Sequence, residues 1–141
     1  MDFVSFYGTI HIFLEGPFIH MHFKGHRGLK IAADVWGSDK ESLVILLHGG
    51  GQTRHAWGET GKKLSEAGYH AVAIDLRGHG DSEWDSDGDY SISAYKQDLI
   101  YIIKEIGKPA CLVGASLGGM TSLLLAGDKK NANLCSALVM V

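Results

Sequence analysis

The sequence has little of what marks a specialised class of protein. Only 2 cysteines and 2 prolines occur among its 141 residues, which argues against a disulfide-rich secreted scaffold and against a proline-rich tract. The net charge of −3 provides no basic surface for nucleic acid. The chain also has no internal repeat and no low-complexity segment. We therefore expect one ordinary globular unit that does not bind nucleic acid.

Long hydrophobic runs are absent as well. The apolar stretch at residues 3–14 is too short and too interrupted to span a bilayer, and it lacks the basic start and the small-residue cleavage site of a secretory signal. Cys111 and Cys135 fall in or beside strands that we expect to be buried, and we interpret both as free thiols in a reducing compartment. We therefore expect a cytoplasmic protein with no membrane partner. Residues 1–16 match no pattern and stay unassigned.

What the sequence does have is a regular alternation of strand and helix patterns. An apolar content of 45% is enough to build a core, and the alternation predicts an α/β fold with a mostly parallel sheet. Ser91 or Ser93 caps the longest expected helix, which Gly107 and Pro109 stop. The expected strands are 18–23, 29–35, 42–47, 70–74, 110–113 and 136–141, and the other expected helices are 57–67 and 121–126.

One segment predicts a nucleophile elbow. The short apolar strand at 110–113 runs into the pattern Gly-x-Ser-x-Gly centred on Ser116, and a helical segment follows. A serine on a tight strand-to-helix turn has a strained backbone, and its hydroxyl projects clear of the sheet. The two glycines keep Cβ atoms out of the space where strand and helix meet. The helix N-terminus beneath the serine can then stabilise an oxyanion.

Two further motifs follow expected strands. The continuous apolar run at 42–47 is typical of a parallel strand buried on both faces. It ends in His-Gly-Gly-Gly at 48–51, a sequence whose backbone N–H groups are free to face a ligand. The strand at 70–74 runs into Asp-Leu-Arg-Gly-His-Gly-Asp-Ser at 75–82. Three such motifs in this order do not arise easily by chance.

Together the three motifs resemble those of the α/β-hydrolase superfamily, in particular its branch of serine esterases, lactonases and cofactor-free peroxidase-like enzymes. The resemblance covers residues 29–141. It implies a three-layer α/β/α sandwich with a mostly parallel sheet. It also implies that residues 1–141 are the N-terminal part of a single domain, truncated after the strand that follows the nucleophile helix.

The resemblance further implies roles for particular residues. Ser116 would be the catalytic nucleophile, and the backbone N–H groups of Gly50 and Leu117 would bind the oxyanion. No cofactor and no metal ion is implied. The family places its catalytic acid and histidine after the nucleophile, on loops that here would lie beyond residue 141. We therefore expect this chain to be part of a longer enzyme and to be inactive alone.

The type of residue at position 116 restricts the reactions that this family resemblance allows. Relatives that cleave epoxides or carbon–halogen bonds place an aspartate there, because a carboxylate must attack. Ser116 instead favours acyl transfer, with a small ester or lactone as substrate. Thioester hydrolysis, carbon–carbon bond hydrolysis and perhydrolysis use the same nucleophile and oxyanion donors and remain alternatives. A further alternative is that the chain is a non-catalytic remnant or a binding module with this fold. The sequence leaves the oligomeric state open.

The remaining polar candidates have simpler interpretations. Asp75, Arg77 and His79 lie in a loop that we expect to be fixed by hydrogen bonds, without a catalytic role. A His-x-His pair on a strand faces one side, but no further ligand completes a metal shell around the histidines His20, His22 and His26.

The tryptophans Trp36, Trp57 and Trp84 are interpreted as packing residues. Trp57 and His55 follow the glycine run and are also candidates to line an acyl pocket.

Overall fold

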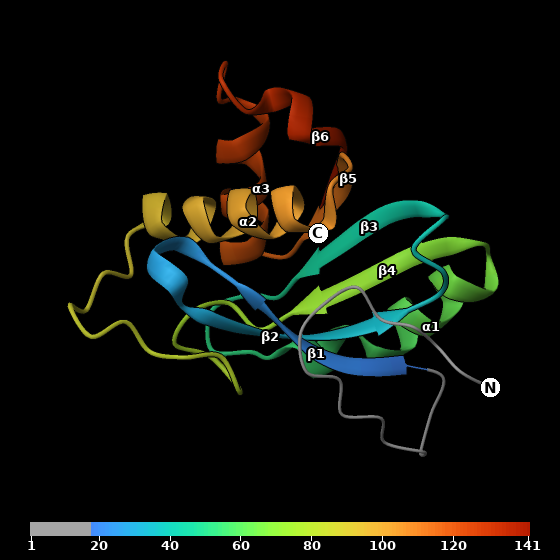
Figure 1. Ribbon diagram of the computed structural model, residues 1–141, viewed down its shortest axis with the longest axis horizontal. Coiled ribbons are helices and arrows are strands. Elements are labelled where there is room, and N and C mark those ends of the chain that lie inside the picture. The colour runs from blue at the N-terminus through green and yellow to red at the C-terminus, as the bar shows by residue number, and fades with distance from the viewer. Residues whose placement is uncertain (1–17) are drawn as a thin grey trace.

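The computed structural model describes residues 18–141 and places six strands in one mixed sheet (Figure 1). The strand order is β1-β2-β4-β3-β5-β6. The pairs β1–β2 and β2–β4 are antiparallel, and the other three pairs are parallel, so the predicted mostly parallel sheet is confirmed. The strands are β1 (Phe18–Lys24), β2 (Lys30–Trp36), β3 (Ser42–Leu47), β4 (Tyr69–Ile74), β5 (Ala110–Gly114) and β6 (Cys135–Met140).

Helices cover both faces of this sheet, which gives the expected three layers. Helices α2 and α3 lie on one side and α1 lies on the other (Figure 1). The α-helices are α1 (Gly58–Glu66), α2 (Ile92–Ile106) and α3 (Leu117–Ala126). Short 3₁₀ turns occur at His26–Gly28, Arg54–Trp57 and Ala132–Leu134.

Strand β3 lies at the centre of the core because every residue from Leu43 to Leu47 is buried. Alternate side chains point to opposite faces. Ile45 and Leu47 pack with α2 and α3, whereas Val44 and Leu46 pack on the α1 side. Each such side chain contributes roughly 1.5–3 kcal/mol through burial, so two-sided burial makes β3 the fixed element to which the following loop is attached.

Helix α2 begins and ends as the sequence predicts, and the structure decides between the two possible caps. The hydroxyl of Ser91 accepts a hydrogen bond from the backbone N–H of Ala94 at 3.2 Å. Gly107 ends the helix in the left-handed region, with φ of 87°, a conformation that glycine adopts without steric cost.

Helix α3 differs from the expectation because it begins at Leu117, four residues before the predicted start at Thr121. Gly118 and Gly119 weaken helical propensity, so the sequence pattern places the start too late. The structure instead shows that the helix starts directly after Ser116. The sequence's unassigned residues 1–16 lie outside the described part. Within residues 18–141, no helix is long and apolar enough to cross a membrane.

Acid should destabilise this fold partly through His70, a buried residue of β4. Burial lowers the pKa of His70 to about 4, and nearby Lys108 acts in the same direction. The unfolded chain therefore binds more protons between a pH of about 6.5 and about 4. We expect the contribution of His70 to stability to be complete above pH 6.5 and to be lost as the pH falls toward 4, by up to about 1.4 kcal/mol per pH unit.

Urea unfolding of the wild type and of His70→Gln at several pH values checks this expectation. The variant should lose free energy of unfolding less steeply between pH 6.5 and 4. The same steepness in both proteins would show that His70 does not remain neutral in the folded state.

Candidate active site

Ser116 lies at the tip of a tight turn between β5 and α3. Its backbone has φ of 47° and ψ of −111°, an unusual conformation for a residue with a Cβ atom and one that costs about 1–3 kcal/mol. Ser116 is exposed, and its side chain does not cap the helix that it precedes. In the described part of the chain, the Ser116 hydroxyl has no hydrogen-bond partner. The structure thus holds a free hydroxyl on a strained turn.

Two glycines make this turn possible. A Cβ atom on Gly114 would lie 2.4 Å from the carbonyl carbon of Gly118. One on Gly118 would lie 2.3 Å from the carbonyl oxygen of Leu47. The N–H of Gly118 also donates to the carbonyl of His48 at 3.1 Å. The elbow therefore packs, backbone against backbone, on the end of β3.

The glycine loop after β3 faces this elbow. A Cβ atom on Gly50 would lie 3.9 Å from Cδ2 of Leu117, so the two predicted oxyanion donors are neighbours. Leu117 is the first residue of α3, where backbone N–H groups have no acceptor within the helix. Among the described residues, the N–H of Gly50 has no hydrogen-bond acceptor either. Among the described residues, the N–H groups of Gly50 and Leu117 are thus both without an acceptor, on two segments that are in contact.

The loop after β4 is held by hydrogen bonds, as the sequence predicts. The Asp75 carboxylate is fully buried and accepts from the N–H of Arg54 at 2.6 Å and from the N–H of Asp81 at 2.9 Å. Arg77 donates from Nε and Nη2 to both carboxylate oxygens of Asp98 on α2, at 2.6 and 2.7 Å. These contacts are structural and leave neither Asp75 nor Arg77 free for chemistry.

Arg54 is the residue of this region that the sequence analysis missed. It is buried, and its guanidinium contacts the carboxylates of Asp34 at 3.0 Å, of Asp81 at 2.8 Å and of Asp75. Burial alone lowers the pKa of Arg54, but the hydrogen bonds to Asp81 and Asp34 outweigh it and raise the pKa. The sequence feature that could have indicated Arg54 is Asp75, an aspartate directly after a strand expected to be buried. A buried carboxylate requires a cation or several hydrogen-bond donors nearby.

His48 and His79, in the loops after β3 and β4, both use their ring nitrogens in hydrogen bonds with the backbone. His48 lies between the N–H of Leu76, at 3.0 Å from Nε2, and the carbonyl of Gly49, at 2.7 Å from Nδ1. Burial lowers the pKa of His48. His79 likewise has both ring nitrogens in hydrogen bonds. All 8 histidines precede Ser116 in the sequence.

The other histidines do not form a metal site in the described residues. His20 packs edge-on against His22 with ring centroids 5.1 Å apart, and its Nδ1 lies 3.1 Å from Asp34. His55 is exposed and lies 4.0 Å from the other Asp34 oxygen. Across residues 18–141, no group of three or more histidine, cysteine, aspartate or glutamate side chains is placed to hold a metal ion.

The tryptophans divide into two groups. Trp36 is buried and Trp57 packs at the edge of the same core, as expected of packing residues. Trp84 is a correction, because 76% of its surface is exposed. It lies in the acidic loop between β4 and α2, where its neighbours in the sequence are mostly polar.

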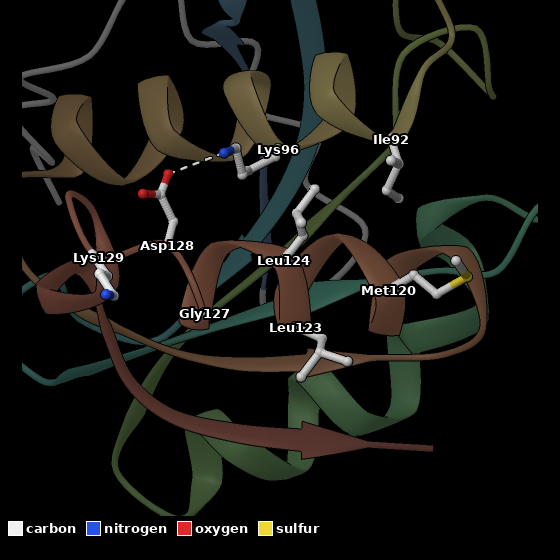
Figure 2. A pocket seen from close by; sticks show the side chains of 8 residues that line it. All are labelled: Ile92, Lys96, Met120, Leu123, Leu124, Gly127, Asp128 and Lys129. Carbon is white, nitrogen blue, oxygen red and sulfur yellow. Dashed lines mark hydrogen bonds and ion pairs between the residues drawn. The ribbon is translucent and has the colours of Figure 1, made fainter.

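A groove lies between α2 and α3 (Figure 2). Its wall includes the apolar side chains of Ile92, Met120 and Leu124, and an ion pair of 3.0 Å joins Lys96 to Asp128 at one end. Neither Ser116 nor Gly50 lines it. The groove therefore adds no group to the chemistry of the elbow.

Comparisons with known proteins agree with this geometry. Residues 42–141 match a family model described as the alpha/beta hydrolase fold. An esterase of Mycobacterium tuberculosis is 42% identical over 97 residues, which cover 68% of this chain and 31% of that protein. A probable protein phosphatase methylesterase of Caenorhabditis elegans is 29% identical over 133 residues, which cover 91% of this chain and 33% of that protein.

A solved structure shares the fold. The crystal structure of an epoxide hydrolase from Vigna radiata superposes with a TM-score of 0.80 at 28% identity, covering 88% of this chain and 39% of that one. The chain thus spans about a third of the length of the relatives that it matches.

The backbone packing at the elbow predicts a specific sensitivity. Gly118→Ala places a Cβ atom against the Leu47 carbonyl, which cannot move without disturbing β3. We expect it to lower the free energy of unfolding by roughly 1–3 kcal/mol. Gly58→Ala is the matched control, because Gly58 is helical, with φ of −53°, and has no atom within 4 Å of the added Cβ.

The control should change stability by less than about 1 kcal/mol, in the stabilising direction. Urea unfolding of both variants measures the difference. Equal effects at the two positions would contradict the close backbone packing described here.

Proposed function

The chain belongs to the α/β-hydrolase fold family, and we propose that it provides the nucleophile and oxyanion site of a serine hydrolase acting on carboxylic esters or lactones. The observation that supports this most is Ser116 itself, an exposed hydroxyl on a backbone with positive φ at the start of α3. The relatives include an esterase and a methylesterase, which act on the same class of bond.

In the proposed reaction the Ser116 oxygen attacks the substrate carbonyl and passes its proton to a general base. Negative charge develops on the carbonyl oxygen, where the N–H groups of Gly50 and Leu117 can donate to it. The positive end of α3 adds to this stabilisation. Loss of the alkoxide, which takes up the proton, leaves an acyl-enzyme on Ser116. Water then attacks this ester to release the acid and restore the serine.

The general base of this scheme is proposed to be a histidine outside the residues described here. Two observations support this. His48 and His79 use both ring nitrogens in hydrogen bonds with the backbone, so neither is free to accept the Ser116 proton. The matched residues also make up only 31% and 33% of the two relatives, which leaves room in those proteins for the rest of a catalytic triad.

Ester cleavage is preferred over epoxide opening because of the chemistry of the nucleophile. Epoxide hydrolases are among the structural neighbours. Attack by a carboxylate gives an ester intermediate that water can hydrolyse, whereas attack by a serine hydroxyl on an epoxide would leave a stable ether. Ser116 at the elbow therefore fits acyl transfer. Thioesters are acyl compounds too, and the same geometry would serve them.

The nucleophile is tested by covalent labelling. A fluorophosphonate probe should react with the natural full-length protein on Ser116. Ser116→Ala should abolish the labelling and lower kcat by up to about 10⁶. Ser93→Ala, on the exposed surface of α2, is the control and should behave as the wild type. Undiminished turnover of an ester by the Ser116→Ala variant would remove this serine from the mechanism.

The oxyanion donor is tested by removing one N–H group. Gly50→Pro lacks the backbone donor, and Gly50→Ala retains it with a Cβ atom that meets only Leu117 at 3.9 Å. Loss of an oxyanion donor costs about 10²–10³ in kcat. We expect that loss in the proline variant and near-normal kcat in the alanine variant, with both melting within a few degrees of the wild type. Equal kcat values in two folded variants would place the donor elsewhere.

A further inference from the structure

Two histidines join the glycine loop after β3 to the loop after β4 in a reciprocal way. His48 belongs to the first loop and accepts the N–H of Leu76 from the second at 3.0 Å. His79 belongs to the second loop and accepts the N–H of Gly51 from the first at 3.1 Å. The two rings also contact each other, with centroids 4.9 Å apart. Each loop is thus held by the other's imidazole.

The hydrogen bonds define the tautomer of both rings. A backbone N–H can only donate, so Nε2 of His48 and of His79 must be the unprotonated nitrogen. Nδ1 then bears the hydrogen in each neutral ring. It donates to the carbonyl of Gly49 at 2.7 Å in His48 and to the carbonyl of Arg77 at 3.0 Å in His79. Neither ring has a nitrogen left with which to move a proton at Ser116.

These contacts account for why Gly50 is the free donor of the glycine loop. The N–H of Gly49 is taken by the side-chain oxygen of Gln52 at 2.9 Å, and the N–H of Gly51 is taken by His79. Of the three glycines at 49–51, Gly50 is the one whose N–H has no acceptor among the described residues. Because both neighbours are held, the directions open to the Gly50 N–H are restricted.

His79 can hold the loop because its own backbone is rigid. Its N–H donates to the Leu76 carbonyl at 2.9 Å, and its carbonyl accepts from Ser82 at 3.0 Å. On one side of this turn Arg77 is bound to Asp98, and on the other Asp81 is bound to the buried Arg54. The imidazole therefore extends from a turn that is anchored at both ends.

We propose that His79 is a positioning residue for the hydrolase reaction, which it serves by holding Gly51 so that the Gly50 N–H meets the developing oxyanion. The proposal rests on the proposed function, since it takes Gly50 as the oxyanion donor. His79 does not touch the reacting atoms. It acts on the transition state through the loop, so its loss should lower kcat and leave KM nearly unchanged.

Two variants separate this role from a general effect on stability. His79→Leu removes the acceptor, whereas Gln in His79→Gln can place its side-chain oxygen where Nε2 lies. In the natural full-length protein we expect His79→Leu to lower kcat roughly tenfold to a hundredfold, as small misplacements of catalytic groups do. KM should change less than about twofold, and His79→Gln should recover most of the lost activity.

His70→Leu is the control for removing an imidazole away from the two loops; His70 is buried, whereas His79 is half-buried, so the control is the more demanding test of stability. His70 lies at the opposite end of β4, where it pairs with Leu43 at the start of β3. At pH 8 this control should keep the wild-type kcat, whatever its effect on melting temperature. A loss of kcat in the control equal to that in His79→Leu would assign the effect to stability and overturn the proposal.

Hydrogen exchange at the Gly51 amide tests the contact without relying on activity. Exchange should be faster in His79→Leu than in the wild type and slow again in His79→Gln. Unchanged exchange, or a His79→Gln variant as slow in turnover as His79→Leu, overturns the role of His79. Full esterase activity in Ser116→Ala would refute the proposed nucleophile instead, and the exchange measurement would still report on the contact of His79 with Gly51.

Discussion

The turn between β5 and α3 packs so closely against the end of β3 that it determines the geometry of the whole candidate site. Gly118 lies so near the Leu47 carbonyl that no side chain fits between them. With strand and helix this close, Ser116 takes a backbone conformation that projects its hydroxyl away from the sheet. The same contact sets the glycine loop beside the start of α3, because that loop continues directly from β3. One steric requirement thus aligns the proposed nucleophile with its proposed oxyanion donors.

Buried charges provide the second level of organisation. Arg54 joins three carboxylates from β2 and from the loop after β4, and Arg77 joins that loop to α2. Buried ion pairs add little net stability, since desolvation offsets most of their attraction. Breaking one is costly, however, because a charge is left buried and unpaired. Here the two arginines connect the loop after β4 to β2, to α2 and to the turn that follows the glycine loop.

The sequence predicts most of the fold because its strongest signals are local. The apolar run of β3, the Ser91 cap and the turn around Ser116 each depend on residues close in sequence. Features that depend on residues far apart in the sequence could not be predicted. Arg54 shows no pattern of its own, since its meaning comes from carboxylates 20 or more residues away. Helix α3 starts earlier than expected because packing on β3 requires the glycines that propensity penalises.

In the proposed reaction the substrate's acyl group is carried on Ser116. Rapid mixing of the natural full-length protein with a nitrophenyl ester, an acid quench and peptide mass mapping test it most directly. We expect a mass increase equal to the acyl group on the peptide that contains Ser116, formed no more slowly than the enzyme turns over. Turnover of the ester with no adduct on that peptide, or with the acyl group on a different residue, would contradict it.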